Sequence, residues 1–410
     1  MRADGAPQLF EVMIKPRGAV CNLACTYCYY LRKDRLYPNS TFRMSDELLE
    51  EFTRQYVLAQ TGPEVTFTWH GGEPTLMGLE FFERAVYYQR KCAPPGMRIQ
   101  NSLQTNGFGL NSDWAQFFAE NGFLIGISLD GPRELHDAYR VDKGRRPTFD
   151  RVMEGLSLLK EYQVAFNVLT AVHRTNERHP LEVYRFLRDD LQAEFIQFIP
   201  IVERVSAGEH QGGSRVTRET VHAARYGEFL IGVFDEWVRR DVGRVYVQIF
   251  DVTLGSWLGQ PSTLCVFAPT CGNALALEHN GDLFACDHFV DPDHLLGNIL
   301  RDPMIELIRS EKQRAFGQAK WTALPRCCRE CEVMFACHGG CPKNRIDYSP
   351  DGELSLNYLC AGYKAFFTHV SPAMQFMTHE LRNRRAPANV MAWMKKRDEL
   401  KSRVDAPSNL

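Results

Sequence analysis

Hydrophobic and polar positions in the first two hundred residues alternate between two patterns. Short runs rich in β-branched and aromatic residues, bounded by Gly, Pro, Asn or Asp, predict strands, and the segments between them carry apolar residues at helical spacing. The predicted strands are Leu9–Lys15, Val65–His70, Met97–Gln104, Phe123–Leu129, Val164–Val172 and Glu194–Pro200. One predicted helix begins after Ser45, which is expected to cap it, and runs through Phe52. The other predicted helices are Leu79–Lys91, Ser112–Asn121, Phe149–Tyr162 and Pro180–Asp190. This alternation predicts an α/β fold with a parallel sheet, and six units are too few for a closed eight-fold barrel, so we expect an open, partial (β/α)6 barrel.

The pattern changes after residue 205. Ser206–Ser214 is Gly-rich and polar and predicts a loop, followed by a predicted helix, Thr217–Arg240, and a predicted strand, Arg244–Ile249. Between Cys265 and Cys360, cysteines and turn residues such as Asn280-Gly281-Asp282 replace long helical patterns, so bound metal is expected to contribute to order there. The expected domains are therefore 1–240, the partial barrel; 241–370, the Cys-rich domain; and 371–410, a helical tail.

Composition narrows the function classes. The chain has 410 residues, 44% hydrophobic residues, 24% charged residues and a net charge of -2, which is typical of a globular protein and excludes a disordered one. A near-neutral charge provides no bulk attraction to nucleic acid or to an anionic membrane. The first ten residues lack the regions of a signal peptide, and no apolar run is long enough to span a membrane. We expect a cytoplasmic monomer with neither nucleic-acid nor membrane partners.

The cysteines are unusual for such a chain, because 13 of them suggest metal binding or redox chemistry in a reducing compartment. Cys21, Cys25 and Cys28 form a C-x3-C-x2-C group directly after the first predicted strand. Three thiolates on one short loop suit a soft metal, whereas a structural zinc site would require a fourth ligand, and none stands beside them. Three ligands on a [4Fe–4S] cluster would leave one iron open to another molecule.

A second cysteine group supplies eight thiols, enough for two four-cysteine [4Fe–4S] clusters, with two zinc sites as the alternative. Its members are Cys265, Cys271, Cys286, Cys328, Cys331, Cys337, Cys341 and Cys360. Cys327 adjoins Cys328 and is a rival ligand, but the C-x2-C spacing to Cys331 favours Cys328. Cys92 stands alone and is expected to be a free thiol.

These motifs resemble known signatures. The first cysteine group, with an aromatic residue before its last Cys, resembles the signature of the radical S-adenosylmethionine (SAM) superfamily, and His70–Pro74 resembles that superfamily's Gly-Gly-Glu-Pro motif. The block Cys328–Cys341 resembles the SPASM domain. The resemblance implies three [4Fe–4S] clusters, ligated by Cys21, Cys25 and Cys28; by Cys265, Cys271, Cys286 and Cys341; and by Cys328, Cys331, Cys337 and Cys360. It also implies a SAM pocket formed by Tyr27, Gly71, Gly72, Glu73, Ser128, Arg140 and Val202.

A closer resemblance, to the anaerobic sulfatase-maturating enzymes, rests on Met13–Pro16, Gly71–Leu76, Tyr88–Lys91, Asn101–Gly107 and Cys286-Asp287. These enzymes oxidise a Cys or Ser of a nascent or unfolded sulfatase, in a Cys/Ser-x-Pro-x-Arg motif, to Cα-formylglycine. The resemblance implies that a SAM-derived radical takes a Cβ hydrogen, a base removes the side-chain proton, and an auxiliary cluster helps to remove the second electron. It also implies a reduced electron donor such as ferredoxin or flavodoxin.

Asp287 is the expected general base, because the family resemblance gives this role to the acid after the cluster ligand Cys286. Alone, the residue would be interpreted as a turn Asp that caps backbone N–H groups. We expect a shielded site to raise its pKa towards the working pH. His288 is the rival base, although neighbouring side chains usually point apart.

Two other functions remain open at this stage. A maturase that crosslinks ribosomally made peptides would share the radical SAM and SPASM parts, but the 20 residues before Cys21 leave little room for a peptide-recognition domain. A zinc- or cluster-stabilised binding module would explain the second cysteine group. It would not explain the presence of the Cys21–Cys28 and Gly71–Pro74 motifs.

Overall fold

The computed structural model describes residues 10–205 and 215–404, so the predicted loop Ser206–Ser214 lies outside the described residues. The chain forms two compact units. Within the described residues, the first unit contains residues 10–129, 136–167 and 269–323, and the second contains residues 130–135, 168–205, 215–268 and 324–404.

The first unit is built on a mostly parallel sheet with strand order β10-β9-β8-β1-β2-β3-β4. Strand β1 pairs in parallel with β2 and β8, with Ile14 opposite Trp69 and Lys15 opposite Glu278, whereas β9 and β10 run antiparallel. The strands are β1 (Glu11–Lys15), β2 (Glu64–Trp69), β3 (Arg98–Thr105), β4 (Leu124–Ser128), β8 (Ala274–Glu278), β9 (Asp282–Phe284) and β10 (Leu295–Asn298). The carboxyl ends of β1 to β4 therefore share one edge, where parallel sheets place their sites.

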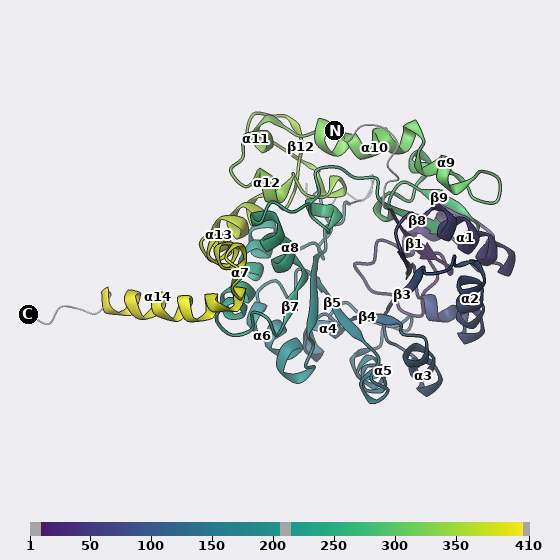
Figure 1. The fold of residues 1–410 in the computed structure, drawn as a ribbon, viewed down its shortest axis with the longest axis horizontal. Helices are drawn as coiled ribbons and strands as arrows, with labels where there is room; N and C mark the ends of the chain where they lie inside the picture. Colours follow the sequence, from purple (N-terminus) through teal and green to yellow (C-terminus); the bar gives the residue numbers. More distant parts are fainter. Residues whose placement is uncertain (1–9, 206–214, 405–410) are drawn as a thin grey trace, which may run out of the picture. The chain divides into compact units, whose positions relative to one another are not determined.

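Helices of the first unit cover this sheet. Ser45 caps α1 by accepting a hydrogen bond from the Leu48 amide, and α1 and α2 lie side by side against β2 through a cluster of aromatic rings that includes Phe52, Phe67 and Phe82 (Figure 1). The helices are α1 (Asp46–Ala59), α2 (Leu79–Cys92), α3 (Ser112–Glu120), α5 (Phe149–Glu161), α9 (Met304–Ile308) and α10 (Glu311–Thr322). Short helical turns are η1 (Leu31–Leu36), η2 (Pro74–Met77), η5 (Asp287–Phe289) and η6 (Pro292–His294), and α4 (Arg133–Asp137) contains a border between the units.

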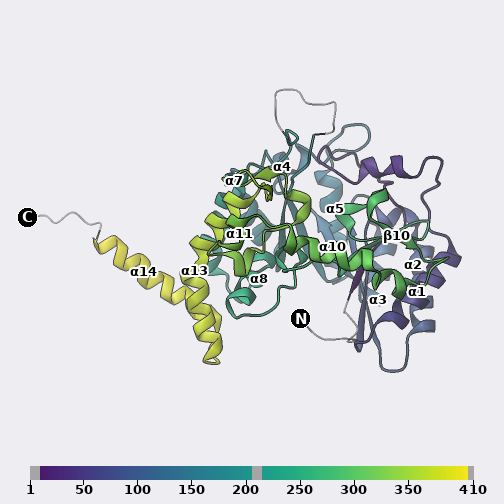
Figure 2. The same ribbon diagram turned by 90° about the horizontal axis from the view of Figure 1, so that it is seen from above.

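The second unit has a parallel run of strands, β5-β6-β7, and a two-stranded hairpin, β11-β12. Helices α7 and α13 cross closely because glycines meet there: a Cβ on Gly362 would lie 2.1 Å from the Ala223 carbonyl oxygen. Both views show α14 extending away from α13 (Figures 1 and 2). The strands of the second unit are β5 (Phe166–Val172, which begins in the first unit), β6 (Phe195–Pro200), β7 (Tyr246–Val247), β11 (Asp347–Tyr348) and β12 (Leu354–Leu356). Its helices are α6 (Pro180–Arg185), η3 (Phe186–Asp190), α7 (Ala223–Arg240), α8 (Gln248–Trp257), η4 (Cys265–Phe267), α11 (Arg326–Arg329), α12 (Met334–Cys337), η7 (Pro342–Asn344), α13 (Cys360–Arg382), η8 (Pro387–Asn389) and α14 (Val390–Val404).

The expected α/β fold with a parallel sheet is confirmed, and all six predicted strands of the first two hundred residues are present. The helix predicted from Thr217 begins only at Ala223, because the extended backbone before it is used elsewhere: the Val221 amide donates to the Ile201 carbonyl. The prediction of a strand over Arg244–Ile249 was largely wrong, because only Tyr246–Val247 pairs and α8 begins at Gln248.

The predicted helical tail is present as α13 and α14, and α13 runs without interruption across residue 370. None of the helices in the described part of the chain is both long and apolar enough to cross a membrane.

Candidate active site

The loop with the first three cysteines follows β1 and is fixed by a second segment of the first unit. The Ala24 amide donates to the Val141 carbonyl at 2.8 Å, and the Thr26 amide donates to the Tyr139 carbonyl at 3.1 Å. Burial, the nearby Glu73 carboxylate and the neighbouring Cys25 and Cys28 thiols raise the pKa of Cys21 to about 12. The Cys25 and Cys28 thiols are therefore close enough to Cys21 to influence its pKa. Their protons must leave when a metal binds, because the thiolate is the ligand.

Amide groups also surround the Cys21 sulfur. The Leu23 backbone N–H donates to Sγ at 3.3 Å, and Asn106 Nδ2 donates to the same atom at 3.5 Å. Asn106 lies directly after β3, so the end of the neighbouring strand supports the cysteine loop. Hydrogen bonds of this kind to a ligating sulfur tune the potential of an iron–sulfur cluster.

The Gly71–Gly72 turn after β2 packs against the segment that leads into the cysteine loop. The Gly72 amide donates to the Gly18 carbonyl at 2.7 Å, and the Glu73 amide donates to the Val20 carbonyl at 2.9 Å. A Cβ on Gly72 would lie 2.1 Å from the Val20 oxygen, so no other residue fits without moving this backbone. Close packing of two protein segments is thus one physical reason for glycine at this position.

Glu73 is fully buried and joins the ends of β2 and β3. Its carboxylate accepts hydrogen bonds from the Thr75 amide at 3.1 Å, the Thr105 hydroxyl at 2.9 Å and the Asn106 amide at 2.8 Å. Burial raises the pKa of Glu73 above its ordinary value. The carboxylate therefore links the loop after β2 to the loop after β3, whose Asn106 contacts Cys21.

The other residues predicted to contact SAM lie in both units. In the first unit, the Arg140 guanidinium lies 5.6 Å from the centre of the Tyr27 ring, and Ser128, at the end of β4, accepts a hydrogen bond from Gln104 at 3.0 Å. Val202 is buried within the second unit. The structure thus brings Tyr27 and Arg140 together beside the cysteine loop.

Asp287, the first residue of η5, is buried directly after Cys286. Its Oδ1 forms an ion pair with Lys15 Nζ from the end of β1, and its Oδ2 accepts a hydrogen bond from the Tyr29 hydroxyl at 2.5 Å. Burial, the largest single influence, acts to raise the pKa of Asp287, but the charge and hydrogen bond of Lys15, together with the neighbouring His70 and His288 side chains, outweigh it and hold the pKa well below the ordinary value. The expectation of a raised pKa was therefore wrong, and the carboxylate is ionised and able to accept a proton.

Two histidines flank this carboxylate. His70 Nδ1 accepts a hydrogen bond from the Gly71 amide at 2.8 Å and lies 3.3 Å from Lys15 Nζ. Burial and the charge of Lys15 lower the pKa of His70 to about 3, so the ring is neutral and its proton is on Nε2. His288 packs edge-on against the Tyr29 ring, with ring centres 5.6 Å apart.

Sequence reasoning missed Lys15, Tyr29 and His70 as partners of Asp287. Lys15 sits in an apolar strand and Tyr29 follows the cysteine motif, so neither belongs to a recognisable acid–base pattern. One available signal was the position of Lys15 at the carboxyl end of a parallel strand, where charged residues often serve a site.

The second cysteine group is divided between the units. Cys271 and Cys286 belong to the first unit, where the Gln313 amide side chain donates to both the Gly272 and Ala285 carbonyls and so links the two cysteine-bearing segments. Cys265 and Cys341 belong to the second unit. The predicted ligand set of this auxiliary cluster therefore draws on both units.

The remaining predicted ligands gather within the second unit. Burial, followed by the neighbouring thiols of Cys327, Cys360 and Cys337, raises the pKa of Cys328 to about 12. The Cys360 thiol in turn interacts with Cys331 and Cys327, so Cys327 lies among the four predicted ligands. Across residues 10–205 and 215–404, no three His, Cys, Asp or Glu side chains are placed to hold a single metal ion. Sets made only of thiols fit iron–sulfur clusters by their donor chemistry.

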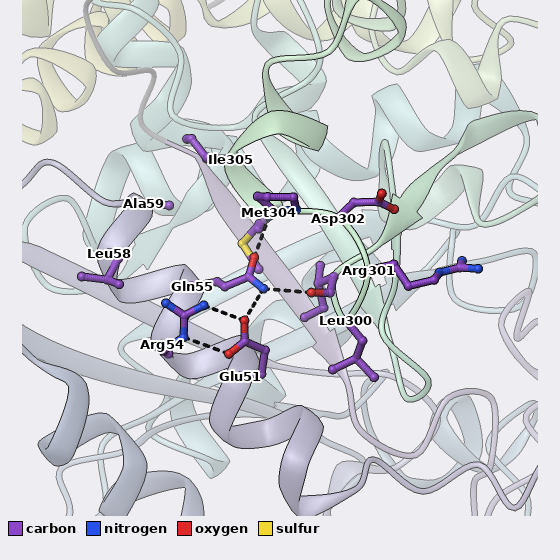
Figure 3. Close-up of a pocket in the computed structure, with 12 residues that line it drawn as sticks. Glu51, Arg54, Gln55, Leu58, Ala59, Leu300, Arg301, Asp302, Met304 and Ile305 are labelled. Atoms are coloured by element: carbon purple, nitrogen blue, oxygen red, sulfur yellow. Dashed lines mark hydrogen bonds and ion pairs between the residues drawn. The ribbon is translucent and has the colours of Figure 1, made fainter.

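A separate cavity of about 400 Å³ lies between α1 and the segment before α9 (Figure 3). Gln55 crosses it, donating to the Ile299 carbonyl at 2.8 Å and accepting from the Met304 amide at 2.6 Å. None of the site residues predicted from the sequence lines this cavity. The candidate active site is therefore the cysteine loop with the Asp287 network.

The chain is similar to known protein families and to individual relatives. Residues 16–187 match the radical SAM superfamily, and residues 265–332 match an iron–sulfur cluster-binding domain, SPASM. The chain is 47% identical to a serine-type anaerobic sulfatase-maturating enzyme of Bacteroides thetaiotaomicron, over 94% of this chain and 95% of that protein. It is 36% identical to a cysteine-type enzyme of Clostridium perfringens, over 89% of this chain and 97% of that protein.

A solved structure, native anSMEcpe with bound AdoMet and Cp18Cys peptide, matches with a TM-score of 0.81 at 34% identity, covering 90% of this chain and 99% of that one. The resemblance noted in the sequence is thereby confirmed, together with a radical SAM core followed by a SPASM domain. The chain belongs to the anaerobic sulfatase-maturating enzymes and is a radical SAM enzyme.

Proposed function

We propose that this enzyme oxidises a Cys or Ser side chain of a sulfatase polypeptide to Cα-formylglycine. The observation that carries the proposal is the buried, ionised carboxylate of Asp287, which lies next to the proposed cluster ligand Cys286 and is held by Lys15 and Tyr29. The similarity to both serine-type and cysteine-type enzymes over nine-tenths of the chain supports a side-chain oxidation of this kind.

Each part of the proposed reaction has residues to perform it. Cys21, Cys25 and Cys28 would hold a cluster with an open iron for SAM; when bound, these groups supply the radical that takes a hydrogen atom from the substrate Cβ. Asp287 accepts the proton of the substrate thiol or hydroxyl, because it is ionised at working pH. A C=X bond forms as the Cβ–H and X–H bonds break: one electron leaves with the hydrogen atom taken by the SAM-derived radical, the X–H proton goes to Asp287, and Cys265, Cys271, Cys286 and Cys341 would hold the auxiliary cluster that accepts the second electron. For a Cys target, hydrolysis of the thioaldehyde then gives the aldehyde.

The finer assignments are also proposals. The SAM pocket comprises Tyr27, Gly71, Gly72, Glu73, Ser128, Arg140 and Val202. Two auxiliary [4Fe–4S] clusters bring the total to three, held by Cys265, Cys271, Cys286 and Cys341 and by Cys328, Cys331, Cys337 and Cys360. The functional division is 1–240, 241–370 and 371–410. The enzyme would work as a cytoplasmic monomer on a Cys/Ser-x-Pro-x-Arg motif and receive electrons from a ferredoxin or flavodoxin.

The test uses the reconstituted protein with SAM, a reductant and two matched peptides that differ only in Ser or Cys at the target position. We expect an aldehyde on at least one peptide, trapped with a hydrazide and located at the target residue by mass spectrometry. Trapping distinguishes this outcome from a crosslink, which also removes two hydrogens but leaves no aldehyde. A crosslinked product without aldehyde, or SAM cleavage with neither product, would contradict the proposal.

A further inference from the structure

Lys15 is a fully buried lysine at the carboxyl end of β1. Lysine is almost never fully buried unless it is paired, because removing an ammonium group from water is costly. Its Nζ forms an ion pair with Asp287, lies 3.3 Å from His70 Nδ1 and stands 4.3 Å above the centre of the Tyr30 ring. His70 is neutral, so the carboxylate of Asp287 is the charge that balances Lys15 in this contact.

The sheet fixes where this ammonium group can be. Strand β1 is flanked by β2 and β8, and Lys15 is in register with Glu278 of β8. Glu278 does not neutralise Lys15 by an ion pair; its Oε1 accepts a hydrogen bond from the Tyr30 hydroxyl. The Tyr30 ring in turn covers Lys15, so the ammonium group is directed towards Asp287.

We propose that Lys15 is a positioning residue that clamps Oδ1 of Asp287 while the Tyr29 hydroxyl holds Oδ2. The inference rests on the proposed role of Asp287 as the base. With each oxygen held by one donor, the plane of the carboxylate is fixed. A carboxylate has about four lone-pair sites, so two remain for the proton of the substrate. When a base is held in one orientation, a larger fraction of the bound complexes have the geometry that proton transfer requires.

The experiment compares Lys15→Met, which keeps length and removes charge, with Lys33→Met as a matched control. Lys33 donates to the Val290 carbonyl, three residues beyond Asp287, and so touches the same segment without being part of the site. In reconstituted protein, we expect Lys15→Met to lower the yield of aldehyde per SAM cleaved by about tenfold or more, as misplacement of a reacting group does. Lys33→Met should keep the wild-type yield. Lys15→Arg keeps the charge and should recover part of the loss.

A second readout does not depend on turnover. The apparent melting temperature is measured for Lys15→Met, Asp287→Asn and the double variant, each reconstituted. We expect each single variant to melt at a lower temperature than wild type, because each leaves one buried charge unpaired. The double variant should lose less than the sum of the two single losses, because it leaves no buried charge of the pair without its partner. Additive losses of melting temperature in the double variant would overturn the pairing.

The two proposals fail in different ways. A wild-type aldehyde yield from Lys15→Met, with Asp287→Asn inactive, would overturn the positioning role and leave the base intact. A wild-type aldehyde yield from Asp287→Asn would overturn the proposed base and, with it, the clamp.

Discussion

Replacing Asp287 with Asn should destabilise the first unit as well as stop product formation. The substitution keeps the size of the side chain and an oxygen that can accept the Tyr29 hydrogen bond, but it leaves the buried Lys15 without its counter-charge. Breaking a buried ion pair by removing one partner typically costs about 3–5 kcal/mol. The retained Tyr29 contact favours the lower end, about 3 kcal/mol, which for a unit of this size lowers the melting temperature by about 6–12 °C.

The destabilisation also has a pH dependence of known sign. In the wild type the pKa of Asp287 is depressed, so its contribution to stability is present above the ordinary Asp pKa and is lost only in acid. In the variant, losing a proton from the unpaired Lys15 ammonium group would stabilise the folded state, whereas the same lysine stays protonated in the unfolded chain. The unfolded state then binds more protons, and stability rises with pH by at most about 1.4 kcal/mol per pH unit.

The assay is thermal unfolding of wild type and Asp287→Asn between pH 6 and pH 9. We expect the difference in melting temperature to narrow as the pH rises. Asp282→Asn is the control, because Asp282 accepts a hydrogen bond from the Tyr37 hydroxyl at 3.1 Å and, within the described residues, forms no ion pair with a lysine or arginine. A gap that stays constant with pH, or an equal gap for Asp282→Asn, would refute the reasoning from the buried pair.

Three further substitutions test other parts of the site. Cys25→Ala should abolish SAM cleavage and remove about a third of the iron, since a four-iron cluster needs its thiolates; normal formation of 5′-deoxyadenosine would contradict this. Cys331→Ala should reduce aldehyde formation more than SAM cleavage in the soluble protein, and equal losses would argue against a separate auxiliary role. Gly72→Ala should impair SAM cleavage by displacing the cysteine loop through the Val20 carbonyl; wild-type SAM cleavage would show that the loop tolerates the added Cβ.

Local patterns predicted the strands well and failed where distant backbone or charge decides the outcome. The helix expected from Thr217 starts late because the Val221 amide pairs with the Ile201 carbonyl, a partner that no helical period reveals. The strand predicted over Arg244–Ile249 stops at Val247, because α8 begins at Gln248 and its Phe250 packs face to face on Phe366 of α13, with ring centres 5.8 Å apart.

The candidate site shows the same limit. The cysteine spacings and the family resemblance named Asp287, because these are written in short stretches of sequence. The sign of its pKa shift depends chiefly on Lys15, which lies in β1, far away in the sequence, and becomes its partner only in the fold. Burial alone would have given the opposite sign.

The proposed reaction is tested most directly by isotope transfer from the target residue. A Ser-x-Pro-x-Arg peptide in which deuterium replaces both hydrogens on the serine Cβ is incubated with the reconstituted enzyme, SAM and a reductant. The Cys counterpart, labelled in the same way, is tested in parallel. We expect 5′-deoxyadenosine to gain one deuterium and the hydrazide-trapped aldehyde of the same peptide to keep one. Deuterium-free 5′-deoxyadenosine formed alongside aldehyde, or deuterium transfer that gives no aldehyde on either peptide, would contradict the proposed reaction.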